Sequence, residues 1–469
     1  MPEQEPKNKK QTALLIVSIV LVVLCAAAAA AVVILGSGKF DFGEPTESAT
    51  QSTAPTTLTP TTTAPPTTTE PTEPPVKKVS TATLVSMGDI LMHGPVRQTY
   101  ITTGYYDANG ALVETGHNYD PVFQYLRPYT ETADYNVINL ETPLAGFGLG
   151  YPYSGVIGSF NAPDAILDGA KSVGFDMFLT ANNHTYDCGS FGMHRTMEVI
   201  LEKELAYLGT QQSADEPDYK VLELSGISIG MACYTYEVTT GDPNHKSLNG
   251  KWVTTADAPL VSSFDYAWMD LFYAQAEADI AAMKEAGAEF IVLYTHWGDE
   301  YQLTGNATQQ AIAQRLCDLG ADVIIGGHPH VVQPVELFTS TVDPEHKTVC
   351  LYSMGNAVSA QRRDKMRLNT GHTEDGVLFS LSFSKYSDGT VILEDADILP
   401  TWVNDKYQIL PIDHDPEVRS LLGVSDGELL QMESSYSRTM AIVGSGLETV
   451  QNYLRENTAL VEAALGIRD

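Results

Sequence analysis

The sequence has little cysteine, with five residues in a chain of 469. Cys25 lies inside a long apolar run, and the other four are widely spaced and form no C-x-x-C pair. This scarcity excludes a disulfide framework and a thiolate metal site of the zinc-ribbon kind. We therefore expect buried free thiols at the other four positions, which are Cys188, Cys233, Cys317 and Cys350.

Positive charge is also scarce. The chain has 27 Lys and Arg residues against 59 Asp and Glu, which gives a formal net charge of -32. Nucleic-acid binding proteins need a basic surface to neutralise phosphates, so the composition excludes nucleic acid as a partner. It indicates an acid-rich surface that keeps the protein soluble.

Long apolar runs are absent except for one, Ala13–Leu35, which is long enough to cross a bilayer core of about 30 Å as a helix. Lys7, Lys9 and Lys10 precede the run, and the next cation after it is Lys39. The positive-inside rule then predicts a cytoplasmic segment at residues 1–12, a transmembrane signal-anchor helix at 13–35, and the rest of the chain outside the cell.

A cleaved signal peptide is the alternative reading of this run, because small residues occur at positions 26–31. The run is longer than a typical signal-peptide core, which favours the anchor. A lipoprotein is excluded because Leu24, and not a small residue, precedes Cys25. Thr and Pro dominate the next segment, so residues 36–77 are predicted to be a disordered stalk.

The segment after the stalk repeats one pattern, in which a short apolar run ends in polar residues and helical spacing often follows. This alternation predicts an α/β sheet with ligands at the carboxyl ends of its strands, so the polar endings should meet at one sheet edge. A domain at 78–405 and a helical C-terminal segment at 406–469 are expected. The six predicted strands are 83–87, 136–140, 175–180, 290–294, 323–325 and 349–352. The predicted helices are 120–132, 163–173, 189–205, 264–286, 308–319, 417–422 and 427–465.

The polar endings supply oxygen and imidazole donors and no thiolate, a set that suits divalent Mn, Fe, Zn or Ni. Each ending alone is weak evidence, because Asp and Asn after a strand often serve turns. The Gly327-His328-Pro329-His330 segment is more specific, since proline stiffens the loop and two histidines can face one centre. We predict one or two ions, where two could activate a water and stabilise charge on the group attacked. The candidate ligands are Asp89, Glu141, Asn183, His296, His328 and His330.

The ordered motifs resemble those of the CapA family, which is named for poly-γ-glutamate capsule biosynthesis and is related to the calcineurin-like metallophosphatases. The resemblance covers about residues 80–400. It implies a four-layer α/β/β/α sandwich, a membrane-tethered domain outside the cell, and a part in making, anchoring or exporting poly-γ-glutamate. The motifs are Gly88-Asp89, Asn139-Leu140-Glu141, Ala181-Asn182-Asn183-His184, Asp187-Cys188-Gly189, His296-Trp297-Gly298-Asp299-Glu300-Tyr301, Gly327-His328-Pro329-His330 and Gly355-Asn356.

The resemblance also implies roles for single residues. The six donors named above would be metal ligands, and His184 would be the catalytic group that meets the scissile bond. The supporting positions near these donors are His93, Asn139, Asn182, Asp187, Glu300 and Asn356.

The densest cationic run beyond the N-terminus contains Arg362, Arg363 and Lys365, shortly after Gly355-Asn356. It could receive an anionic substrate at the mouth of the site, or it could be a solvated loop. No internal repeat is evident.

Two functions follow from these features. The first is a di-metal, phosphoesterase-like hydrolase that acts on an anionic envelope polymer such as poly-γ-glutamate. The second is a non-catalytic component that binds or exports the polymer and keeps the fold. The presence of His184 beside Asn183 favours the hydrolase, because a binder has no need of an acid–base group there. The expected partners are the cell membrane, the polymer and other capsule-synthesis membrane proteins.

Overall fold

The computed structural model describes residues 75–467, apart from positions 107, 111, 149, 157 and 368. The predicted anchor at 13–35 and nearly all of the predicted stalk lie outside the described residues. Within the described part of the chain, no helix is both long and apolar enough to cross a membrane.

The first sheet is mixed, and its central strand β1 runs parallel to its neighbour β4 and antiparallel to its neighbour β17. Its order is β19-β18-β17-β1-β4-β5-β6, and the short β16 pairs with the end of β1. The strands are β1 (Lys78–Ile90), β4 (Tyr135–Leu140), β5 (Met177–Leu179), β6 (Ala206–Leu208), β16 (Asn356–Val358), β17 (Asp375–Tyr386), β18 (Val391–Val403) and β19 (Ile409–Pro411).

The second sheet has the order β11-β8-β12-β13-β15-β14, with β7 paired to β8. Its central strands β8, β12, β13 and β15 run parallel. The strands are β7 (Tyr219–Leu224), β8 (Ile227–Tyr236), β11 (Ser263–Phe264), β12 (Phe290–His296), β13 (Val323–Gly327), β14 (Val335–Thr339) and β15 (Lys347–Leu351).

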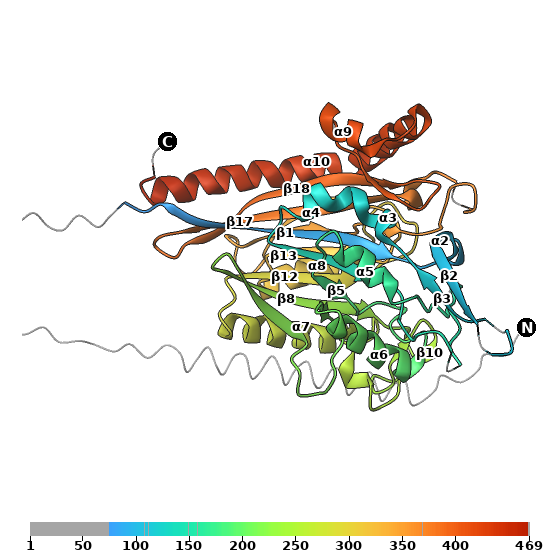
Figure 1. The fold of residues 1–469 in the computed structure, drawn as a ribbon. Helices are drawn as coiled ribbons and strands as arrows, with labels where there is room; N and C mark the ends of the chain where they lie inside the picture. Colours follow the sequence, from blue (N-terminus) through green and yellow to red (C-terminus); the bar gives the residue numbers. More distant parts are fainter. Residues whose placement is uncertain are drawn as a thin grey trace, which may run out of the picture. The chain divides into compact units, whose positions relative to one another are not determined.

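Alternate residues of the central strands face different cores. Leu84 of β1 and Val292 of β12 belong to one cluster shared by the two sheets, whereas Val85 and Leu293 face helices on opposite sides. Both faces of these strands are therefore buried, which explains their nearly continuous apolar sequence. The helices on the outer faces (Figure 1) are α5 (Ala165–Lys171) and α6 (Gly189–Glu202) on the first sheet, and α7 (Met269–Glu285) and α8 (Ala307–Leu319) on the second.

The predicted α/β class and the six predicted strands are confirmed, as are most of the predicted helices. The single helix predicted at 120–132 is wrong. The segment forms α3 (Asp120–Phe123), a 3-10 turn (Gln124–Leu126) and α4 (Arg127–Thr130), since Pro128 lacks the N–H that a continuous helix needs. The helix predicted from residue 264 begins only at Met269, because Phe264 belongs to β11.

The C-terminal segment forms α9 (Pro416–Leu422) and the long α10 (Asp426–Ala464). Ser425 begins α10 with a capping box, in which its side chain accepts from the Glu428 backbone N–H. Val443 and Leu447 of α10 enter the core between the sheets, and the helix runs along β18 (Figure 1). The helix thus covers the end of the core shared by the two sheets.

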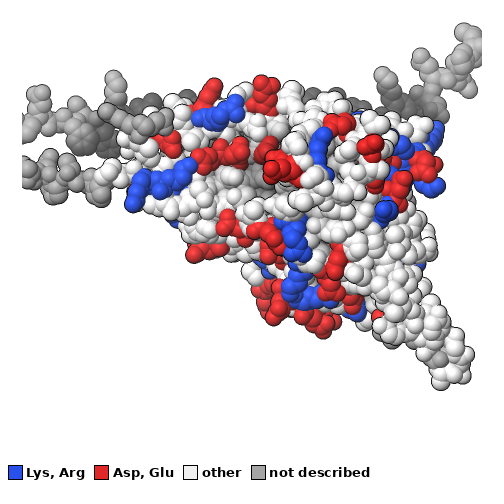
Figure 2. Space-filling model, turned by 45° about the horizontal axis from the view of Figure 1, so that its top comes forward, with Lys and Arg blue, Asp and Glu red and all other residues white. Residues whose placement is uncertain are grey.

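Two small hairpins lie outside the sheets, β2 (Ile101–Tyr106) with β3 (Leu112–His117), and β9 (Ser247–Leu248) with β10 (Lys251–Trp252). All six residues of β2 are exposed. The remaining short helix, α2 (Gly94–Thr99), connects β1 to β2. Acidic side chains are spread over the face drawn in Figure 2, often beside Lys or Arg, as the net charge predicts.

Candidate metal centre

The carboxyl ends of strands from both sheets meet at one cluster of polar side chains. Asp89 ends β1, and Glu141 and Asn183 follow β4 and β5 of the same sheet. His296 ends β12, and the two other predicted ligand histidines follow β13 of the second sheet. The expectation of one edge of one sheet is corrected, because two stacked sheets contribute. All six predicted ligands are buried, namely Asp89, Glu141, Asn183, His296, His328 and His330.

Short distances join the side chains across the two sheets. The Nε2 atom of His296 lies 3.0 Å from Asn183 Oδ1 and 3.3 Å from Glu141 Oε1. The Nδ1 atom of His330 approaches Asp89 Oδ2 to 3.2 Å, and its Nε2 atom lies 3.8 Å from Glu141 Oε1. Residues more than 200 positions apart in the sequence therefore form one site.

Two overlapping groups of donor atoms could each hold a metal ion. One contains Glu141, His328 and His330, and the other contains Asp89, Glu141 and His296, with the atoms of each group within 4.8 Å of one another. Both carboxylate oxygens of Glu141 and the Nδ1 atoms of His328 and His330 are buried without a hydrogen-bond partner. Buried polar atoms normally have partners, so these residues fit a bound cation. Glu141 belongs to both groups.

The electrostatics of the cluster support the same conclusion. Burial and the nearby Asp89 raise the pKa of Glu141 well above its usual value. Burial opposes ionisation of Asp89 too, but interaction with His330 and His296 lowers its pKa overall. Burial lowers the pKa of His296 to about 3 and that of His328 well below its usual value. The imidazoles of His296 and His328 are therefore neutral, which is the form that binds metal, and a cation would stabilise the two carboxylates.

The loop after β13 is held in a strained conformation. His328 and His330 have φ angles of 93° and 55°, in the left-handed region that side chains other than glycine rarely adopt. The backbone N–H of His328 donates to Asp89 Oδ2 at 3.3 Å, and a Cβ atom added to Gly327 would lie 3.0 Å from Asp89 Oδ1. Asp89 thus helps to fix the loop that carries both histidines. Strain of this kind is typical of functional sites.

Three of the predicted supporting residues position their neighbours. Asn139 donates to Asp89 Oδ1 at 2.7 Å, and Asn182 donates to Asn139 Oδ1 at 3.3 Å. Asn356 donates to the backbone carbonyl of His330 at 3.2 Å. These amides therefore orient candidate ligands from behind the cluster.

His184 lies beside the cluster and belongs to neither donor group. Its Nδ1 atom is 2.8 Å from Asp187 Oδ2, and its Nε2 atom is 4.0 Å from Glu141 Oε1. Phe160 packs edge-on against the His184 ring at 4.7 Å, and Asn249 Nδ2 lies 3.4 Å from Nδ1. Asp187 therefore fixes one ring nitrogen while the other faces the cluster. This arrangement suits an acid–base group, although the role itself stays a prediction.

The two other supporting residues border the same space. The His93 ring packs edge-on against Phe160 at 5.2 Å, and burial lowers its pKa to about 4, with His330 adding to the shift. Glu300 is exposed, but its charge acts on Glu141. Both are near the cluster and outside the two donor groups.

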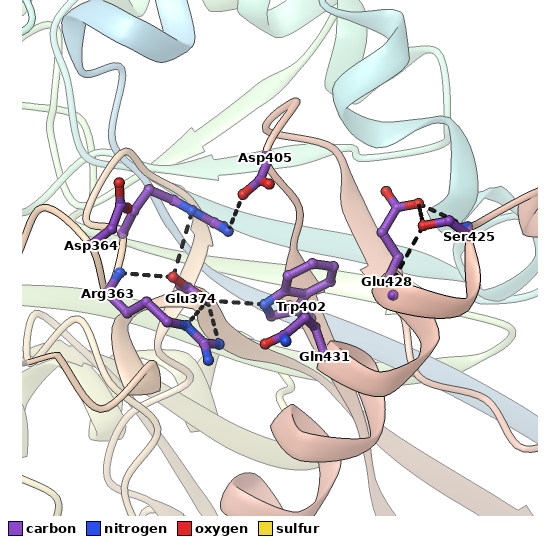
Figure 3. A pocket seen from close by; sticks show the side chains of 10 residues that line it. Arg363, Asp364, Glu374, Trp402, Asp405, Ser425, Glu428 and Gln431 are labelled. Carbon is purple, nitrogen blue, oxygen red and sulfur yellow. Dashed lines mark hydrogen bonds and ion pairs between the residues drawn. The ribbon is translucent and has the colours of Figure 1, made fainter.

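The predicted anion-binding arginines lie in a different cavity, of about 630 Å³ (Figure 3). Arg363 donates to Glu374 Oε2 through Nε and Nη2, at 3.0 and 2.7 Å. Arg362 contacts Asp405 at 2.9 Å and Glu374 at 3.6 Å. Lys365 pairs with its neighbour Asp364 at 2.8 Å. Each cation already has an acidic partner, and anion binding by these residues stays a prediction.

The sequence reasoning missed Tyr236, whose ring stacks parallel to His296 at 6.4 Å and lies 4.7 Å from His328. It also missed Phe160 and Asn249. Tyr236 ends β8, which is an apolar strand followed by polar residues like the six that were identified. That signal could have found it. Phe160 lies in an irregular loop, where no comparable pattern exists, whereas Asn249 begins the Asn249-Gly250 turn between β9 and β10, a dipeptide typical of hairpins.

Comparisons with known proteins agree with the motifs. The chain is 25% identical over 320 residues to the capsule biosynthesis protein CapA of Bacillus anthracis, covering 68% of this chain and 66% of that protein. It is 28% identical over 246 residues to the PGA biosynthesis protein CapA of Bacillus subtilis (strain 168), covering 52% of this chain and 57% of that protein. The chain thus spans less than two thirds of the length of each relative. Residues 83–361, more than half of the chain, match one family, and the protein belongs to that family, the bacterial capsule synthesis protein PGA_cap.

Proposed function

We propose that this protein is a membrane-anchored, extracytoplasmic component of capsule synthesis that acts as a metal-dependent hydrolase on an anionic envelope polymer. The observation that carries the proposal is the set of buried polar atoms without partners on Glu141, His328 and His330, next to His184. A purely structural cluster would satisfy these atoms internally. The α/β fold and the cluster at its strand ends support this proposal.

The residues present fit one or two divalent ions of Mn, Fe, Zn or Ni. Glu141 with His328 and His330 would hold one position, and Asp89 with Glu141 and His296 the other. Bound there, the ions would supply Lewis-acid catalysis and an activated water. The chain itself orients these donors through its buried amides and excludes bulk solvent from them.

His184 is the group that would handle a proton. Its Nδ1 atom is held by Asp187, so Nε2 faces the cluster and can donate a proton to a leaving oxygen or nitrogen. Asp187 also accepts from the backbone N–H of Phe160, at 2.8 Å. Oδ2 of Asp187 makes both contacts, and so links the His184 imidazole to the Phe160 backbone.

The names of the two relatives refer to capsule and PGA biosynthesis. We infer from them that the substrate is a polymer of the cell envelope such as poly-γ-glutamate, cleaved at an amide, ester or phosphoester bond. Because the relatives' names describe synthesis, a non-catalytic component that binds or exports the polymer is the second candidate. The other capsule-synthesis membrane proteins would be partners in either case.

The decisive experiment uses residues 73–469, which form one compact unit. Metal analysis of this fragment should find at least one divalent ion per chain, and the loaded fragment should cleave poly-γ-glutamate or a phosphoester in a substrate screen. Metal without any hydrolysis would favour the binding component. A fragment that takes up no Mn, Fe, Zn or Ni would overturn both the metal centre and the hydrolase.

Topology is tested separately on intact cells. Protease added from outside should release the domain, because the positive-inside rule applied to the lysines before residue 13 predicts a cytoplasmic N-terminus. Protection of the domain, or a mature N-terminus near Ala31, would contradict the anchor.

A further inference from the structure

Arg97, on α2, has a guanidinium group without an acidic partner. Its Nε atom is buried and has no hydrogen-bond partner, and it forms no ion pair within the described residues. Arg195 and Arg438 are also partly buried, but each has an acidic partner. Arg195 binds Asp164 at 2.8 and 2.7 Å, and Arg438 binds Asp375 at 2.8 and 2.6 Å. An uncompensated, partly buried cation in a chain of net charge -32 is best explained by an anion that binds it.

Aromatic rings lie beside α2, where the Tyr119 hydroxyl donates to the backbone carbonyl of Arg97 at 3.3 Å. His117 stacks on Tyr119 at 5.6 Å and meets the edge of Tyr153 at the same distance. The charge of Arg97 acts on all three rings, and after burial it is the main cause that lowers the pKa of His117 to about 4. Rings of this kind offer apolar faces to the methylene groups of a flexible chain. Arg97 and the three rings are here termed the Arg97 subsite.

One loop connects the Arg97 subsite to the metal centre. Tyr153 and Phe160 belong to the same loop, and Phe160 contacts both His93 and His184. The loop also packs closely on the start of α2, since a Cβ atom added to Gly155 would lie 1.9 Å from the backbone nitrogen of Gly94. A polymer bound at His184 could therefore place a neighbouring unit against α2.

We propose that Arg97 binds a carboxylate of an acidic polymer beside the metal centre and so helps to select that polymer as the substrate. The proposal rests on the function proposed above and adds a specificity-determining residue to it. A guanidinium group recognises a carboxylate through two parallel hydrogen bonds, and no carboxylate of the described residues forms an ion pair with Arg97. The rings would contact the methylene groups between successive carboxylates.

Two acidic groups also act on Tyr153 from the same surroundings. Asp164 is held by Arg195, so it is not available to Arg97. Glu114 is exposed on β3 and forms no ion pair within the described residues. Glu114 would repel an acidic ligand, and Glu114→Gln should bind the polymer at least as tightly as the wild type.

The test measures binding of a fluorescent oligo-γ-glutamate to the full-length, metal-loaded protein in detergent. Arg97→Met should weaken binding by about 10- to 100-fold, the effect of losing a hydrogen-bonded charge pair. It should also reduce the salt dependence of binding, while the metal content and Tm stay near wild type. Arg97→Lys keeps the charge and loses the planar fork, so its affinity should be intermediate.

A matched control is Arg315→Met. Arg315 is a half-buried arginine on α8, in the outer helical layer of the second sheet, where it lies over the Tyr273 ring at 5.9 Å. This variant removes the same charge and should bind the oligomer as the wild type does. An uncharged oligo-γ-glutamine should bind weakly and equally to the wild type and Arg97→Met.

Equal affinity of the wild type, Arg97→Met and Arg97→Lys for oligo-γ-glutamate would overturn the proposal, as would a wild type that does not bind it. Arg97-dependent binding of a polyglycerol phosphate alone would replace the carboxylate with a phosphate and also overturn it. These outcomes are distinct from failure of the proposed function, which is read from metal content and hydrolysis. A hydrolase indifferent to Arg97 would keep the function and lose only this inference.

Discussion

The metal centre and the Glu374 cluster, which consists of Arg362, Arg363, Glu374 and Trp402, both bury charged side chains, but they differ in how those side chains are satisfied. In the Glu374 cluster, Glu374 accepts hydrogen bonds from Arg363 and from Trp402 Nε1. In the metal centre, both oxygens of Glu141 lack such a partner. A dense run of charge in the sequence is therefore a weaker sign of a ligand than a buried atom that nothing in the protein satisfies.

The two glutamates show the difference electrostatically. Both are almost completely buried. For Glu374 burial opposes ionisation, but hydrogen bonds from Arg363 prevail and lower its pKa. For Glu141 burial and the charge of Asp89 act together and raise the pKa well above the usual value. Glu374 is therefore stabilised as a carboxylate by its protein partners, whereas Glu141 would be stabilised as a carboxylate by a bound cation.

The sharpest test of this contrast is His328→Ala. The substitution removes an imidazole from the group with Glu141 and His330, so metal content and hydrolysis should both fall to near background. Metal is measured by elemental analysis after dialysis. His346→Ala is the matched control. The Nε2–H of His346 donates to the backbone carbonyl of Ala321 at 2.9 Å, and His346 belongs to neither donor group, so this variant should keep its metal. Full metal content in His328→Ala would contradict the assignment.

His184→Ala tests whether the residue beside the cluster is a catalyst or a ligand. Because His184 belongs to neither donor group, metal content should stay near wild type. The rate should fall by about 10²- to 10⁴-fold, the usual effect of losing an acid–base group. His194→Ala is the control. His194 lies on α6, where its Nε2 atom is 3.0 Å from Asp257 Oδ1, and this variant should keep normal turnover. Loss of metal in His184→Ala would show that ligand and catalyst were interchanged.

Glu374→Gln tests the Glu374 cluster, in which the buried carboxylate is paired with arginines. The substitution leaves Arg362 and Arg363 without their buried carboxylate, so the free energy of unfolding should drop by about 3 kcal/mol, the lower end for broken buried pairs. The lower end applies because the Arg363 side chain is 33% exposed. Urea unfolding measures this loss, and metal content should not change. Asp405→Asn, at a side chain 95% exposed, should alter stability little.

Much of the site could be predicted because the end of each buried strand is visible in the sequence as a change from apolar to polar residues. Asp89, His296 and His328 each follow an apolar run, and the topology of α/β proteins brings such ends together. The second sheet could not be found this way, since stacking depends on alternate residues such as Leu84 and Val292 meeting across a core. The antiparallel strands β17 and β18 were not identified either.

The state of single charges was also beyond sequence reasoning. Arg362 and Arg363 stand out in the sequence, yet Glu374, eleven residues later, neutralises much of their charge. Arg97 is inconspicuous, and its lack of a partner is visible only once the surrounding side chains are placed. Ion pairing depends on three-dimensional contacts. The sequence therefore identifies the charged residues but not which of them have partners.

The smallest expected effect comes from Asp279→Asn. This variant tests whether a buried carboxyl group without a cationic partner is by itself evidence of a metal site. Burial and the charge of Asp218 raise the pKa of Asp279, on α7, to about 7. Its carboxyl oxygens nevertheless accept hydrogen bonds from Tyr234 at 2.6 Å and from Gln275 at 2.7 Å. A raised pKa means that the folded state binds the proton more tightly, so this stabilisation is complete below about pH 4 and is lost as pH rises towards 7. Asp279→Asn should flatten that part of the stability profile and raise Tm at pH 8 by roughly 2–4 °C, with no change in metal content. Parallel Tm profiles for the wild type and the variant would show that the proton is not bound as described. A change in metal content would instead break the distinction between satisfied and unsatisfied carboxylates on which the metal centre was identified.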